Sequence, residues 1–254
     1  MHVVDLLLLG IAAFAAGLVD AVVGGGGLIL TPSLLLVAPQ APIAAVLGTI
    51  KCSSVIGTTA AALTYARQIA LDARLLIPGV IAALSAACAG ASLVSHLDAT
   101  VVKPLILLAL VVVAIYTALK PDLGAQAGAE RSVRARTGIG IALGAVIGFY
   151  DGFLGPGTGS FLAVALVLLA RFDFLRAAAH ARVLNVASNL GAVAWFVPHG
   201  NVLWLAVLPM ALCNLAGGVL GSRLALRQGS RWIRRVLLLV VSVLIVRLGW
   251  NLFG

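Results

Sequence analysis

Four charged residues that lie within apolar stretches of this sequence, or directly beside one, form two matched sets. Asp20 and Lys51 belong to the first half of the chain, and Asp151 and Arg182 follow them by 131 positions. An ionised carboxylate inside a membrane helix costs about 2.5–3.5 kcal/mol on insertion scales, so such a residue usually faces a cavity or a partner. A basic group from each half suits a small oxyanion, and a desolvated carboxyl can take up a proton. These residues predict either an anion site with gating or proton-coupling acids, or structural ion pairs and helix-end caps.

The two basic residues differ in their predicted depth. Lys51 lies about nine residues inside its apolar segment, or roughly 13 Å along a helix, which is near the middle of a membrane. Arg182 lies nearer the end of its segment. Its position therefore fits either a substrate ligand or an anchor at the cytoplasmic surface.

Polar side chains follow each basic residue at intervals of three and seven positions, which places them on one helical face. They are Ser54 and Thr58 in the first half, and Asn185 and Asn189 in the second. Such groups bind an anion or join membrane helices structurally. His180, two positions before Arg182, is a further candidate ligand, with a loop or interfacial histidine as the alternative.

Glycine-rich runs follow both acids. Gly24-Gly25-Gly26-Gly27 comes after Asp20, and Gly155-Pro156-Gly157-Thr158-Gly159 comes after Asp151. Glycine inside a helix costs about 0.8–1.0 kcal/mol relative to alanine, and proline removes a backbone donor, so both runs predict helix breaks. Free N–H groups at the start of a following half-helix form an anion-binding surface. The candidate donors are Gly24, Gly25, Gly26, Gly155, Gly157 and Thr158; close helix packing is the alternative.

The elements that carry these residues are predicted to be membrane helices. Hydrophobic residues make up 62% of the 254 positions, charged residues make up 10%, and the mean hydropathy is +1.16. This composition predicts an all-α polytopic membrane protein with about eight to ten helices or half-helices. The apolar segments are Leu6–Val23, Leu28–Val37, Ile43–Ala66, Leu75–Ser95, Pro104–Leu119, Gly138–Leu154, Ser160–Ala170, Val183–Val197, Val202–Leu220 and Val236–Phe253. The second and seventh segments are too short to span.

Basic residues predict the orientation of the chain. Fourteen of the 17 lie in four loop regions: Arg67 and Arg74; Lys120, Arg131, Arg134 and Arg136; Arg171, Arg176 and Arg182; and Arg223, Arg227, Arg231, Arg234 and Arg235. The positive-inside rule places these regions in the cytoplasm and both termini in the periplasm of a bacterial inner-membrane protein. The net charge of +9 then needs no nucleic-acid partner, although a basic face attracts anionic membrane lipid.

The two halves are predicted to be inverted repeats. The offset of 131 also aligns Gly17 with Gly148 and Pro78 with Pro209. Residues 1–119 form the first repeat, 120–136 a cytoplasmic linker and 137–254 the second repeat. Because each half holds five segments, an odd number, the halves insert with opposite orientation. Transporters commonly place their site between such repeats.

Several other chemistries are disfavoured. Cys52, Cys88 and Cys213 show no metal-ligand spacing, so neither a metal nor another cofactor is expected. The glycine runs lack the Lys-Ser/Thr of a phosphate-binding loop. We find no nucleophile–histidine–acid or paired-carboxylate pattern, and an enzyme is not expected.

Motifs across almost the whole chain resemble the sulfite exporter TauE/SafE family, also called the toluene-sulfonate uptake permease family. The motifs are Gly17-Leu18-Val19-Asp20 through Leu30-Thr31-Pro32; Gly148-Phe149-Tyr150-Asp151 through Gly159-Ser160-Phe161; His180-Ala181-Arg182 through Ser188-Asn189; and Gly221-Ser222-Arg223-Leu224-Ala225. The last two resemble the YfcA-like branch of the family. The resemblance implies an inner-membrane permease for sulfite, sulfonates or related organosulfur anions.

The expected function is therefore secondary transport of a small sulfur-containing anion by alternating access. Lys51, Arg182 and their polar neighbours bind the substrate in this hypothesis, and Asp20 and Asp151 act in gating or proton coupling. The alternatives are an anion channel and a non-transporting membrane scaffold or assembly factor. The sequence leaves open the direction of transport, the coupling ion and whether the chain forms a homo-oligomer.

Overall fold

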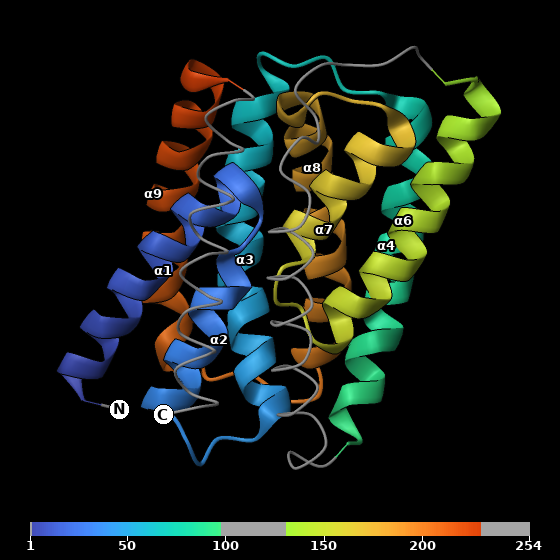
Figure 1. Ribbon diagram of the computed structural model, residues 1–254. Coiled ribbons are helices and arrows are strands. Elements are labelled where there is room, and N and C mark those ends of the chain that lie inside the picture. Colours follow the sequence, from blue (N-terminus) through green and yellow to red (C-terminus); the bar gives the residue numbers. More distant parts are fainter. Residues whose placement is uncertain (1, 98–130, 230–254) are drawn as a thin grey trace, which may run out of the picture.

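The computed structural model describes residues 2–97 and 131–229, and every element in these ranges is helical (Figure 1). The first half contains α1 (Val3–Val23), α2 (Gly26–Val37), α3 (Ile43–Ala66) and α4 (Ala73–Ser95). The second half contains α6 (Val133–Phe153), α7 (Thr158–Ala165), the π-helical turn η1 (Leu166–Ala170), α8 (Phe174–Phe196) and α9 (Trp204–Gln228). Helices α1, α3, α4 and α9 are long and apolar enough to cross a membrane. The chain is a polytopic membrane protein. The predicted segments Pro104–Leu119 and Val236–Phe253 lie outside the described residues.

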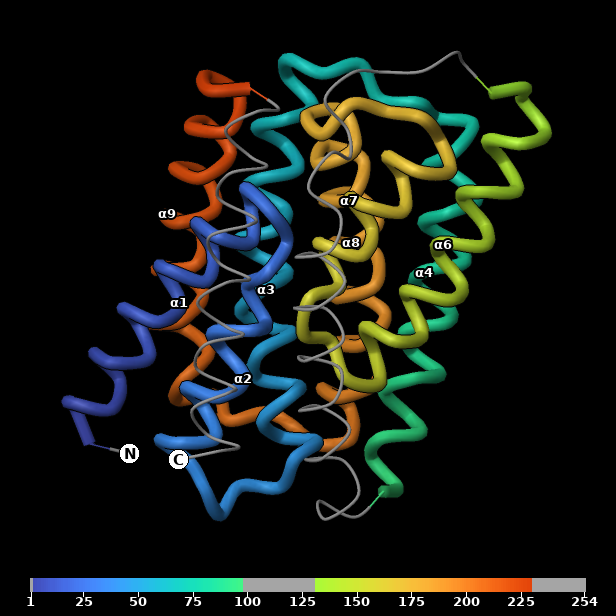
Figure 2. Tube along the Cα trace, viewed as in Figure 1, coloured from blue at the N-terminus to red at the C-terminus, as the bar shows by residue number. Residues whose placement is uncertain are grey.

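The described helices of the two halves run in opposite directions. In Figure 2, α3 runs from the lower to the upper end, whereas α8, its counterpart in the repeat, runs from the upper to the lower end. Helices α4 and α9 are opposed in the same way. The short helices also obey this relation: α2 returns to the lower end from which α1 starts, and α7 returns to the upper end from which α6 starts. Each glycine run is therefore the inner turn of a helical hairpin.

Each half contributes one helix that packs along the first described helix of the other half. Helix α9 of the second half packs along α1 of the first, and α4 of the first half packs along α6 of the second. Small residues permit this close approach. A Cβ atom at Gly17 would lie 2.3 Å from the carbonyl oxygen of Asn214, and one at Gly148 would lie 2.8 Å from Cα of Ala83. These two glycines are equivalent in the repeat, so the same packing device occurs on both sides.

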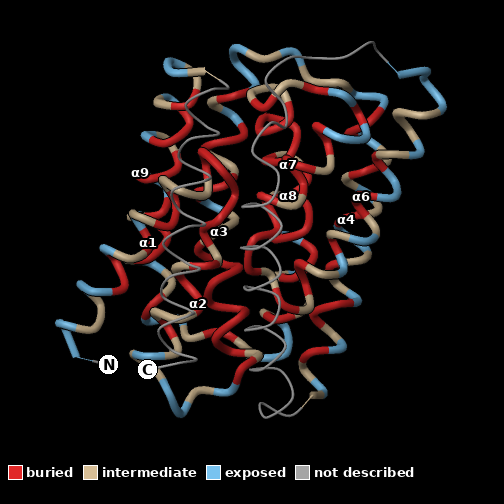
Figure 3. Tube along the Cα trace, in the orientation of Figure 1, coloured by how far each residue is buried: buried red, intermediate tan, exposed pale blue. Residues whose placement is uncertain are grey.

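Apolar side chains cover the outside, and polar groups lie within. Val3, Leu36, Val146 and Leu208 are all more than 60% exposed, as expected of residues that face lipid. Figure 3 shows the buried residues on the faces where helices meet. Fifteen polar or charged residues are buried among the described ones, most of them on α3 and α8. This distribution explains why α8 has a low mean hydropathy although it is as long as a spanning helix.

Two predicted boundaries are wrong because polar residues continue a helix. Helix α8 begins at Phe174, nine residues before the predicted start, and α6 begins at Val133, inside the predicted linker. The side chain of Asp173 accepts a hydrogen bond from the backbone N–H of Arg176 and so caps α8. Ser132 caps α6 in the same way through Ala135. Arg134, Arg136 and Arg176, which resembled loop residues, therefore belong to the first turns of capped helices.

Candidate functional site

The two glycine runs cross near the centre of the helix bundle. Gly24 ends α1 in the left-handed conformation, with φ of +87°, and its N–H donates to the carbonyl oxygen of Asp20 at 2.8 Å. A Cβ atom at Gly24 would lie 2.0 Å from the carbonyl carbon of Gly159. The side chain of Ser160 donates to the carbonyl oxygen of Val23 at 2.7 Å, and its N–H donates to that of Gly24 at 3.2 Å. Only glycine satisfies both the conformation and the close approach at position 24.

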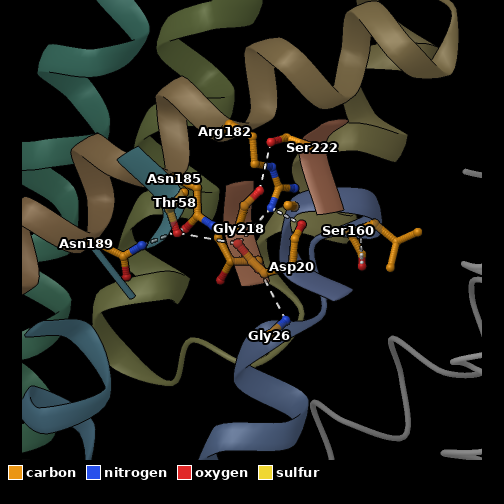
Figure 4. A network of polar contacts seen from close by, with 12 residues as sticks. Asp20, Gly26, Thr58, Ser160, Arg182, Asn185, Asn189, Gly218 and Ser222 are labelled. Carbon is orange, nitrogen blue, oxygen red and sulfur yellow. Dashed lines mark hydrogen bonds and ion pairs between the residues drawn. The ribbon is translucent and has the colours of Figure 1, made fainter. Parts of the chain in front are cut away.

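Two buried ion pairs cross between the halves at this point. The Nζ atom of Lys51 on α3 lies 2.6 Å from Oδ1 of Asp151 on α6. The Nη1 atom of Arg182 on α8 lies 2.9 Å from Oδ2 of Asp20 on α1 (Figure 4). Each acid thus pairs with the basic residue of the other half. The acid and base of each pair are equivalent, through the repeat, to those of the other pair.

The short helix of each half orients the acid of that half. The N–H of Gly26, in the first turn of α2, donates to Oδ1 of Asp20 at 3.2 Å. The hydroxyl of Thr158, in the first turn of α7, donates to Oδ1 of Asp151 at 2.6 Å. Thr58 of α3 adds a longer contact of 3.4 Å to Oδ2 of Asp20. These bonds stabilise carboxylates at a buried helix break, where the positive end of the helix dipole also favours negative charge.

A small polar cavity lies between the breaks and the middle of α3 and α8. It has a volume of about 30 Å³, which is room for about two water molecules at about 10–15 Å³ each. Its lining residues are Asp20, Gly24, Gly27, Thr31, Leu47, Ile50, Lys51, Ser54, Thr58, Asp151, Leu154, Gly155, Thr158, Gly159, Asn185 and Asn189. Lys51 is the basic residue of this lining. An oxyanion with several heavy atoms enters only if the ion pairs or the breaks move apart.

Most of the predicted site residues meet at this cavity. Those that line it are Asp20, Gly24, Lys51, Ser54, Thr58, Asp151, Gly155, Thr158, Asn185 and Asn189. Gly25, Gly26, Gly157, His180 and Arg182 do not line it. The first three belong to the turns that shape the breaks, and Gly157 has φ of +81°. Arg182 lies behind the lining, where it holds Asp20.

Two predicted environments are wrong. The alternative of Arg182 as a surface anchor fails because the side chain is 0% exposed and bonded to Asp20. His180 is likewise buried in α8 and lies neither in a loop nor at the cavity. Its Nε2 accepts from the N–H of Asp72 at 2.9 Å, and its Nδ1 lies 2.7 Å from the carbonyl oxygen of Arg176. The histidine therefore ties the α3–α4 loop to α8.

Thr31, Gly27 and Gly159 also line the cavity, together with the apolar residues Leu47, Ile50 and Leu154, and none of them is among the predicted site residues. Thr31 had a usable signal, because it follows Gly27 by one helical turn and so shares its face. The apolar lining had none, because leucine and isoleucine occur throughout the chain. No cluster of three or more His, Cys, Asp or Glu side chains suits a metal ion within residues 2–97 and 131–229.

A family model of the sulfite exporter TauE/SafE matches residues 9–248. The chain belongs to this family. A probable membrane transporter protein, ORF9, from Sinorhizobium sp. is 36% identical over 96% of this chain and 92% of its own length. The probable membrane transporter protein YfcA of Escherichia coli K12 is 33% identical over 100% of this chain and 94% of its own length. A probable membrane transporter protein of Haemophilus influenzae is 32% identical, over 97% of each chain. No solved structure matches.

Membership in the TauE/SafE family, together with these relatives, identifies the chain as a membrane transporter. It also confirms the resemblance that the motifs around Asp20, Asp151 and Arg182 indicated. Within this TauE/SafE member the crossed ion pairs, the paired helix breaks and the polar cavity occupy one central place. That place is the candidate transport site.

Proposed function

We propose that this protein is a secondary transporter that carries small sulfur-containing anions, such as sulfite or sulfonates, across a bacterial inner membrane. The observation that carries the proposal is the position of Lys51, which is 4% exposed and lines the cavity between two helix breaks. A buried ammonium group is costly unless it is paired, and an anion in the cavity can replace Asp151 as the partner of Lys51. The family description, which names sulfite, supports the substrate class.

The site offers an anion several donors besides Lys51. The hydroxyls of Ser54 and Thr58 and the amides of Asn185 and Asn189 line the same cavity. The first turns of α2 and α7 place Gly27, Thr158 and Gly159 in the lining, and the positive ends of both helix dipoles favour an anion there. Sulfite and sulfonates carry three oxygens on one sulfur atom, so they can accept from several of these donors at once.

Charge balance favours coupling to protons. The two acids and two bases cancel when all are ionised, so an added anion leaves the buried site with a net negative charge. Protonation of Asp151 would cancel this charge and release Lys51 from its ion pair. The second carboxylate oxygen of Asp151, Oδ2, is buried and has no hydrogen-bond partner among the described residues, so it is available for the proton.

The orientation follows from the charged ends of the bundle. The loop between α3 and α4, the start of α6, the start of α8 and the end of α9 all lie at the upper end in Figure 1. These segments contain Arg67, Arg74, Arg134, Arg176 and Arg227. By the positive-inside rule this end faces the cytoplasm, and the opposite end, where α1 begins, faces the periplasm.

Uptake by proteoliposomes tests the function. The purified protein should take up radiolabelled sulfite or methanesulfonate with saturation, and Lys51→Ala should reduce this uptake at least tenfold because one charge-assisted hydrogen bond is lost. Arg223→Ala, which removes an exposed arginine on α9, should leave it unchanged. Equal uptake by the wild type and Lys51→Ala would refute the site. Flux without saturation would instead identify a channel.

A further inference from the structure

The guanidinium group of Arg182 is fully buried, yet only one of its three nitrogens is engaged. Nη1 donates to the carboxylate and to the carbonyl oxygen of Asp20. Nε and Nη2 have no hydrogen-bond partner among the described residues. Buried donors are almost always paired in native proteins, so two unpaired ones on one side chain need an explanation.

The two unpaired nitrogens lie on one edge of the guanidinium. Nε and Nη2 direct parallel N–H bonds outward, and this edge binds two oxygens of one anion in a bidentate arrangement. We call this pair of parallel N–H donors on Nε and Nη2 the fork. A lysine in the same place would offer a point charge without a fork. The ion pair with Asp20 uses Nη1 and therefore leaves the fork open.

The guanidinium lies directly behind the cavity wall. Gly159 lines the cavity, and a Cβ atom at this glycine would lie 2.5 Å from Nη2 and 2.9 Å from Nη1 of Arg182. Asp20, the partner of Arg182, also lines the cavity. The wall at this point is thus the bare backbone of the first turn of α7. Figure 4 shows Arg182 beside Asp20, with its guanidinium directed at the carboxylate.

Specific hydrogen bonds join this wall to the first half of the chain. Two hydrogen bonds from Ser160 fix the start of α7 to the carbonyl groups of Val23 and Gly24 at the end of α1. Lys51, which is equivalent to Arg182 in the repeat, already lines the cavity. In transporters with inverted repeats, the halves move against each other around a fixed site. The corresponding movement in the second half would bring the fork of Arg182 to the cavity.

We infer that the Nε–Nη2 edge of Arg182 is a second subsite for anions that present two or more oxygens from one atom, such as sulfonates. Gly159 lies against the Nη2 end of this edge in this conformation, and the subsite opens when the first turn of α7 separates from the end of α1. The inference rests on the proposed function and adds a specificity element to it. Spherical anions such as chloride gain little from the fork.

The first test compares Arg182→Lys with the wild type in proteoliposomes. The lysine keeps a positive charge opposite Asp20 but has no fork, so the apparent KM for methanesulfonate should rise about tenfold or more. Lys51→Arg, which keeps the charge at the equivalent position, is the matched control and should alter the KM less. An unchanged KM in Arg182→Lys would overturn the inference. Absence of methanesulfonate uptake by the wild type would count instead against the proposed function.

The second test uses the unaltered protein, so it does not depend on the folding of a variant. Phenylglyoxal, which modifies arginine, is added to the protein in liposomes, and modification is followed by peptide mass spectrometry. We expect slow modification of Arg182 that methanesulfonate suppresses several-fold and chloride does not. The exposed Arg67 and Arg74 should react at the same rate under all conditions. An Arg182 that never reacts, or that reacts equally with and without methanesulfonate, would overturn the inference.

Discussion

Lys51 and Arg182 each form an ion pair with an aspartate, but the two basic side chains have different surroundings. Lys51 reaches the cavity, and its ion pair with Asp151 lies in the cavity wall. Arg182 is 0% exposed, and its partner Asp20 separates it from the cavity on one side. Removal of one member of a buried pair costs about 3–5 kcal/mol because the other charge remains unpaired. In the proposed transport site, the Lys51 pair is therefore the one that we expect a substrate to open at the lower cost.

The proton dependence of transport tests the role of Asp151. Protonation cancels the charge of Asp151, so anion flux should rise as the pH falls on the side from which the anion enters. Asp151→Asn imitates the protonated form at every pH, and its flux should be independent of an imposed proton gradient. Asp151→Glu keeps a carboxyl group and serves as the control. A gradient-dependent flux in Asp151→Asn would assign the coupling to another group.

The helix breaks act as structural elements through two separate properties of glycine. Gly24 has a positive φ, and it also touches the backbone of Gly159. Gly200 has φ of +71° in the loop before α9, but no described atom would lie within 4 Å of a Cβ atom there. Substitutions at the two positions therefore distinguish two contributions to the free energy of unfolding. One is the strain of a side chain in a left-handed backbone conformation, and the other is the overpacking where the two helix breaks cross.

Alanine substitutions measure these costs. Gly200→Ala should lower the free energy of unfolding by about 1–2 kcal/mol, the cost of a left-handed residue with a side chain. Gly24→Ala should lower it by about 1–3 kcal/mol more, because the crossing is overpacked. Titration of each protein with SDS in mixed micelles gives the free energies. Equal losses in the two variants would mean that the crossing at Gly24 tolerates a methyl group.

The same elements explain how much the sequence could predict. The breaks were predictable because glycine runs and Pro156 exclude a continuous helix whatever the fold. The start of α8 was not, because Arg176 and Arg182 resemble loop residues until their partners are known. The sequence also allowed Lys51 to pair with either acid. Its pairing with Asp151 depends on how α3 and α6 meet, and no local pattern encodes that contact.

At the scale of the whole molecule, the helices of the two halves run in opposite directions. The orientation of the chain in the membrane can be measured directly. The loop between α2 and α3 contains the exposed Gln40, and the loop between α3 and α4 contains the exposed Gln68. A membrane-impermeant maleimide should label Gln40→Cys in intact cells, and it should label Gln68→Cys only after permeabilisation. The protein without an added cysteine gives the background. The reverse pattern would mean that the basic end of the bundle faces the periplasm.

The crossed ion pairs join residues that are synthesised at different times. Asp20 is made 162 residues before Arg182, its partner. At about 5–20 residues per second, the carboxylate waits roughly 8–30 seconds for its counter-charge. During that time α1 and its acid must remain near the insertion machinery, near water or in the protonated form. The first half therefore enters the bilayer without the ion pair of Asp20. That pair forms only when α8 is inserted, and its formation fixes the position of α1.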